Sequence, residues 1–158
     1  MSVMRRAFIG GQRGLTYSAV LAQALADGRQ RRFVQEVLTL ARQLPDLLEQ
    51  PLPAALQTLT PATGPQFLDA DTMREIVDAL TAFGAGRPLG ICLRRSLLRY
   101  HYLRRNGLPV VIHFGARRLG DDIAGHAWLT LYGQPYHEKP EHVLLHSLMW
   151  SYPDTEDR

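Results

Sequence analysis

The chain has 158 residues, of which 46% are hydrophobic and 21% charged, and its formal net charge at pH 7 is +3. These values are ordinary for a soluble globular protein, and the charge is too small to indicate binding to nucleic acid. A chain of this length buries roughly 70% of its unfolded surface, so it needs no disulfide or metal ion to fold. The single cysteine excludes an intrachain disulfide and fits a reducing compartment. No apolar run suits a signal peptide or a membrane span, so we expect a cytoplasmic protein.

The first part of the chain has the pattern of helices. Helical composition or a periodic apolar face is present in three segments, namely 15–26, 31–44 and 47–59. Pro45 should end the second of these helices, because proline disfavours helical backbone in the residue before it. The range 60–68 contains two prolines and a glycine and is expected to be a linker.

Two further helices are predicted. The first covers 69–83, where Thr72 and Glu75 have the spacing of a capping box. The second covers 92–105 and ends at an Asn-Gly pair. Its arginines are interpreted mostly as a solvated helix face, although contact with an acidic peptide or a partner is the alternative for them and for Arg117 and Arg118.

After residue 107 the pattern changes to that of strands. Alternating or β-branched runs predict strands over 108–114, 124–132 and 135–138, with glycine turns between them. The range 141–150 fits either a helix or a strand. Helices followed by an antiparallel meander indicate an α+β domain.

Cys92, His126 and Glu138 are the candidate functional residues. A thiol attacks as thiolate, which the first turn of a helix and a nearby imidazolium both favour, and Cys92 follows the helix breakers Pro88 and Gly90. His126 shares a strand face with Trp128, which could cover its ring. A carboxylate at Glu138 could fix the imidazole tautomer. A buried structural cysteine, an exposed strand histidine and a solvated glutamate remain the alternatives for the three positions.

A metal site is the other chemistry to consider. His137, His142 and His146 lie near Glu138 and Glu141 in the sequence. Pro140 interrupts any helix through them, and the His-Glu-x-x-His pattern of zinc proteases is missing. We therefore expect neither a metal nor a cofactor.

Taken together, four segments resemble the transglutaminase-like cysteine peptidases of lasso-peptide biosynthesis, namely 92–97, 103–109, 114–118 and 125–129. The resemblance implies a transglutaminase- or papain-like core with a cysteine helix packed on an antiparallel sheet. It implies Cys92 as nucleophile, His126 as base and Glu138 as the third member. Because that family often has aspartate in the third place, His137 remains an alternative to Glu138. We expect a variable helical part over 1–66 and the peptidase core over 67–158.

The resemblance also implies a function. The enzyme would remove the leader peptide from a ribosomally made lasso-peptide precursor, before a separate cyclase closes the macrolactam. Its expected partners are the precursor, a recognition-element protein that holds the leader by β-strand addition, and the cyclase. A transglutaminase-like acyltransferase and a non-catalytic peptide-binding module of the same fold are the alternatives.

Overall fold

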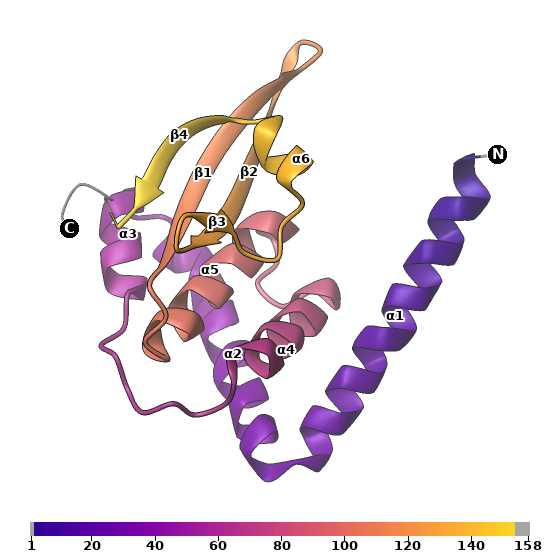
Figure 1. The fold of residues 1–158 in the computed structure, drawn as a ribbon, viewed down its shortest axis with the longest axis vertical. Helices are drawn as coiled ribbons and strands as arrows, with labels where there is room; N and C mark the ends of the chain where they lie inside the picture. The colour runs from indigo at the N-terminus through magenta and orange to yellow at the C-terminus, as the bar shows by residue number, and fades with distance from the viewer. Residues whose placement is uncertain (1, 154–158) are drawn as a thin grey trace.

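A computed structural model of the protein describes the backbone of residues 2–153 and the side chains of residues 14–153. Within this range, six α-helices and one four-stranded antiparallel sheet confirm the predicted α+β fold (Figure 1). The helices are α1 (Ser2–Ala26), α2 (Gly28–Leu47), α3 (Leu52–Leu59), α4 (Ala70–Ala82), α5 (Ile91–Arg105) and α6 (Pro140–Leu144). The strands are β1 (Val110–Leu119), β2 (Asp122–Leu131), β3 (Gln134–Pro135) and β4 (Ser147–Tyr152). No helix of residues 2–153 combines the length and the apolar content needed to cross a bilayer.

The sheet has the strand order β3-β2-β1-β4, and a tight hairpin joins β1 to β2 (Figure 1). Its register places Gly115 opposite His126 and Phe114 opposite Ala127. Helix α5 packs against β1 and β2, and α4 packs against α5. Because successive strand side chains alternate between faces, Ala127 and Leu129 lie on the face that α5 covers.

One cluster of buried apolar side chains fills the space between the sheet, α5 and the earlier helices. Its fully buried members come from almost every layer and include Phe33, Leu56, Met73, Tyr100, Ile112 and Leu129. Burial of each large side chain contributes about 1.5–3 kcal/mol relative to exposure. The cluster thereby fixes the position of α5 on the sheet. The expected division of the chain into a helical part and a peptidase core, between residues 66 and 67, stays a prediction.

The end of one predicted helix and the cap of another are wrong for local reasons. Helix α2 continues through Pro45 to Leu47, because a proline so near the helix end costs only the hydrogen bond that its missing N–H would have donated. Helix α4 covers Ala70–Ala82, close to the predicted range 69–83, but Thr72 is not its cap. Asp69 is its N-cap and accepts a hydrogen bond of 2.9 Å from the amide of Thr72.

The C-terminal part also differs from the sequence pattern. Strands β1 and β2 extend further into their hairpin than expected, since the turn is formed only by Gly120 and Asp121. Strand β3 ends at Pro135 instead of reaching residue 138. The range 141–150 contains both elements that it suggested, namely α6 and the start of β4.

The arginines of α5 do not form the solvated face that the sequence suggested. Arg94 and Arg99 are buried, and Arg95 is half-buried. Arg94 donates hydrogen bonds to the carbonyls of Leu89 and Thr81, at 2.9 and 2.8 Å. Arg94 therefore satisfies one carbonyl group at the end of α4 and one in the segment between α4 and α5, and so attaches the two helices to each other.

Candidate active site

Cys92 is the second residue of α5, as predicted, and Gly90 is the N-cap. The neighbouring imidazole of His126 holds the pKa of the Cys92 thiol below its ordinary value of 9.0. Burial acts in the opposite direction, and the backbone amides of Ala127 and Leu93 add to the lowering. The local environment of Cys92 thus favours the thiolate.

His126 lies on β2 and faces Cys92. Contacts with Cys92 and Glu138 raise the pKa of His126 to about 9, although burial opposes the rise. Its ring is stacked against Trp128, with ring centres 5.8 Å apart and an interplanar angle of 18°. His146, just after α6, stacks at 5.0 Å. At neutral pH, His126 is therefore an imidazolium held between other rings.

Glu138 is the carboxylate that faces His126. Its Oε2 lies 3.4 Å from Nε2 of His126, as an ion pair that lacks the alignment of a hydrogen bond. The interaction with His126 lowers the pKa of Glu138, with a smaller contribution from His142, whose Nδ1 is 3.3 Å from Oε1. Since Nε2 faces Glu138, Nδ1 is the ring nitrogen that remains available to the thiol.

Glu138 does not lie on the strand that the sequence predicted. The chain leaves the sheet after Pro135 and bends, and His137 takes a positive φ of 49°. This turn directs Nε2 of His137 to within 3.6 Å of Asp71, away from His126. Of the two neighbours that the sequence left open, Glu138 is the one that contacts His126.

Ser96 is a site residue that the sequence analysis missed. It follows Cys92 by one helical turn, and its buried hydroxyl donates a hydrogen bond of 2.9 Å to the carbonyl of Ala127. Ala127 is the neighbour of His126 and its amide also contacts the thiol. Ser96 therefore fixes α5 to β2 beside both functional groups. In the sequence, the only indication of this role is that Ser96 lies four residues after Cys92, which places both on the same face of a helix.

Replacing Ser96 by alanine tests this connection. We expect Ser96→Ala to lower the free energy of unfolding by about 1 kcal/mol, because a buried hydrogen bond is lost. Urea unfolding measures that change. The pH profile of Cys92 alkylation should also shift upward, since the thiol and imidazole lose their fixed spacing. An unchanged alkylation profile would show that Ser96 supports the fold alone.

A groove of about 500 Å³ opens beside Cys92. Its lining includes His126 and Glu138 and also three basic residues, Arg95, Arg99 and Lys139. Among the side chains of residues 14–153, no group of three His, Cys, Asp or Glu residues is placed to hold a metal ion. The chemical groups of the site are thus a thiol, an imidazole and a carboxylate beside a space that is open to a ligand.

Comparison with known proteins identifies the family of the chain. The family model described as the transglutaminase-like superfamily matches residues 37–145, which is more than half of the chain. That match begins within α2 and contains Cys92, His126 and Glu138. No curated protein and no solved structure matches the chain. Proteins of this superfamily are usually cysteine peptidases or acyltransferases. The chain belongs to the transglutaminase-like superfamily.

Proposed function

We propose that the protein is a cysteine endopeptidase that removes the leader from a ribosomally made lasso-peptide precursor. One observation supports the hydrolase activity: Cys92 faces His126, and His126 in turn faces Glu138, where these residues line the groove. The lasso-peptide part rests on the resemblance of the segments around Cys92 and His126. A recognition-element protein would present the leader, and the cyclase would take the released core peptide.

The first half of the reaction is acylation. The thiolate of Cys92 attacks the carbonyl carbon of the scissile bond, and the backbone amide of Cys92 stabilises the developing oxyanion. His126, as imidazolium, gives its proton to the departing amine, so the carbon–nitrogen bond breaks and a thioester remains. Glu138 stabilises the imidazolium and fixes its orientation throughout.

Deacylation uses the same groups in reverse. Neutral His126 takes a proton from water, and the resulting hydroxide attacks the thioester carbonyl. The carbon–sulfur bond breaks, the leader leaves with a new carboxyl group, and the thiolate–imidazolium pair is restored. If a primary amine replaced water in this step, the same site would act as an acyltransferase.

The test is incubation of the protein with a precursor peptide and its recognition-element protein, followed by mass spectrometry. The proposal expects a leader with a free carboxylate and a core peptide with a free amine. A parallel reaction contains excess methylamine. A leader that carries methylamide as its main product would overturn hydrolysis in favour of acyl transfer. An intact precursor in both reactions would contradict both activities.

The thiolate–imidazolium pair of Cys92 and His126 predicts an unusual pH dependence of Cys92 alkylation. Because the pKa of Cys92 is lowered, iodoacetamide should react at pH values where an ordinary thiol is protonated. Peptide hydrolysis should decline as pH rises through about 9, where His126 loses its proton. Glu138→Gln removes a charge that favours the imidazolium, so this alkaline limb should move to lower pH. If alkylation of Cys92 depended on pH in the same way as alkylation of a free cysteine peptide, the thiolate–imidazolium pair would be contradicted.

A further inference from the structure

The groove beside Cys92 has a basic wall, which is formed by Arg95, Arg99 and Lys139. We propose that this basic wall binds an acidic side chain of the peptide substrate and so determines where the chain is cleaved. The inference rests on the proposed peptidase function and specifies its substrate class.

The basic wall runs along the helix that carries the thiol. Arg95 and Arg99 follow Cys92 by three and seven residues, so all three lie on one face of α5. At a rise of 1.5 Å per residue, the arginines are displaced about 4.5 and 10.5 Å along the axis. An extended peptide advances about 3.3 Å per residue. The basic wall therefore suits a side chain roughly one to three residues from the scissile bond.

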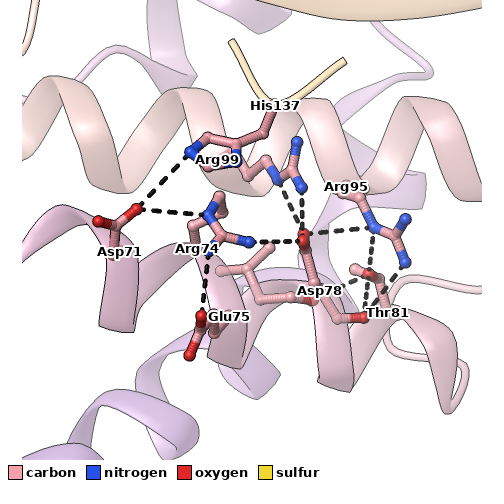
Figure 2. Close-up of polar contacts among 9 residues, drawn as sticks. Asp71, Arg74, Glu75, Asp78, Thr81, Arg95, Arg99 and His137 are labelled. Carbon is pink, nitrogen blue, oxygen red and sulfur yellow. Dashed lines mark hydrogen bonds and ion pairs between the residues drawn. The ribbon is translucent and has the colours of Figure 1, made fainter. Parts of the chain in front are cut away.

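The positive charges around Asp78 exceed its own charge. Arg99 donates two hydrogen bonds to its carboxylate, at 2.8 and 2.5 Å, and Arg95 approaches to 3.4 Å (Figure 2). Arg74 is 3.5 Å away, but it also pairs with the more exposed Asp71 and Glu75. Asp71 and Glu75 balance the charge of Arg74, and none of these three residues lines the groove. Asp78 is the shared counter-ion of Arg95 and Arg99, so one positive charge is left over among these three groove residues.

Other groups around the groove reduce this excess. The imidazolium of His126 faces both Glu138 and the thiolate of Cys92, so these three groups together carry one negative charge. Lys139, at the rim, is exposed and pairs with no acidic side chain among residues 14–153. With Lys139 included, the groups that line the groove keep one net positive charge, and Asp78 is the single carboxylate that pairs with the basic wall. An acidic side chain would meet a favourable potential there.

Each of the two arginines also keeps one nitrogen for a ligand. Arg95 uses Nε on the hydroxyl of Thr81 and Nη2 on the carbonyl of Asp78, at 3.1 and 3.2 Å. Arg99 uses Nε and Nη2 on the carboxylate of Asp78. Neither Nη1 donates to any group that the structure describes in residues 14–153. Because the guanidiniums are already held in place, a carboxylate would bind them at a small entropic cost.

Peptide binding to the Cys92→Ala protein tests the inference without requiring cleavage. The probes are two pools of short, C-terminally amidated peptides that differ only in having Glu or Gln at each position in turn. Amidation removes the terminal carboxylate, so only the side chain differs in charge. We expect the best Glu peptide to bind about five- to tenfold more tightly than its Gln partner, with the difference declining as salt is added.

Variants then assign the preference to the basic wall. Adding Arg95→Gln or Lys139→Gln should reduce the preference for Glu, whereas Arg95→Lys should retain most of it. Arg118→Gln, which removes an exposed arginine of β1 that does not line the groove, is the matched control and should change nothing. Lys139 is on the surface, so its substitution does not threaten the fold.

The outcomes separate this inference from the proposed function. Equal binding of the Glu and Gln pools, or a preference that survives both Arg95→Gln and Lys139→Gln, overturns the acidic specificity even if the wild-type protein cleaves peptides. A preference for Glu that depends on the basic wall supports it, even if no peptide is cleaved and the peptidase proposal fails.

Discussion

Cys92→Ala is expected to reduce release of the leader from a precursor peptide by at least about a thousandfold. The reaction needs a nucleophile that forms a thioester, and the methyl group of alanine supplies none. Cys92 is the only cysteine of the chain, so no other thiol can replace it. Release is measured as the leader and core masses that accumulate with time, with the recognition-element protein present in excess.

His126→Ala is the companion to this variant, because acylation and deacylation both require its proton transfers. Activities of the two single variants and the double variant should be nearly equal, since groups that act as one unit do not contribute additively. Circular dichroism checks that each variant keeps the helical fold. Cleavage by Cys92→Ala at a rate near that of the wild type would remove the sulfur from the mechanism and with it the cysteine peptidase.

The sequence predicted the parts of the site that depend on local structure. Cys92 could be placed at a helix start because breakers precede it, and His126 could be placed on a strand because its neighbours alternate. Both features depend only on residues within a few positions. The strands and the antiparallel order followed from the same kind of pattern. The structure confirms this α+β arrangement and brings the two side chains together.

Glu138 shows where local reasoning stopped. Its contact with His126 depends on a bend after Pro135 and on the positive φ of His137, and neither follows from a strand pattern. The sequence could therefore name Glu138 but could not separate it from His137. The direction in which two adjacent side chains point was decided by one backbone angle.

The arginines of α5 were misjudged for a different reason. Five of its fifteen residues are arginine, which in an isolated helix would indicate a solvated face. Arg94, Arg95 and Arg99 find partners on α4, where the Asp78 carboxylate and the carbonyls at the helix end accept their hydrogen bonds. Arg105 pairs with Glu36 of α2. Asp78 is surrounded in the sequence by the apolar residues of α4, so it carries no sign of this role until the two helices are packed together.

Asp78→Asn is expected to lower the free energy of unfolding by about 3–5 kcal/mol. Asp78 is 6% exposed, and its carboxylate is the shared partner of Arg99, Arg95 and Arg74. An amide keeps the shape of the carboxylate but loses its charge, which leaves Arg95 and Arg99 close together without a counter-ion. Urea denaturation measures the change.

Asp71→Asn is the matched control, because this aspartate also pairs with Arg74 but its side chain is 74% exposed. Its substitution should cost less than about 1 kcal/mol, as for other surface ion pairs. Equal losses for the two variants would contradict a special role for Asp78. Combining Asp78→Leu with Arg99→Met should recover part of the lost stability, since apolar side chains can replace a buried ion pair. Such recovery would show that Asp78→Asn loses stability because the charge of Arg99 is unbalanced, and not because the contact between α4 and α5 is generally disturbed.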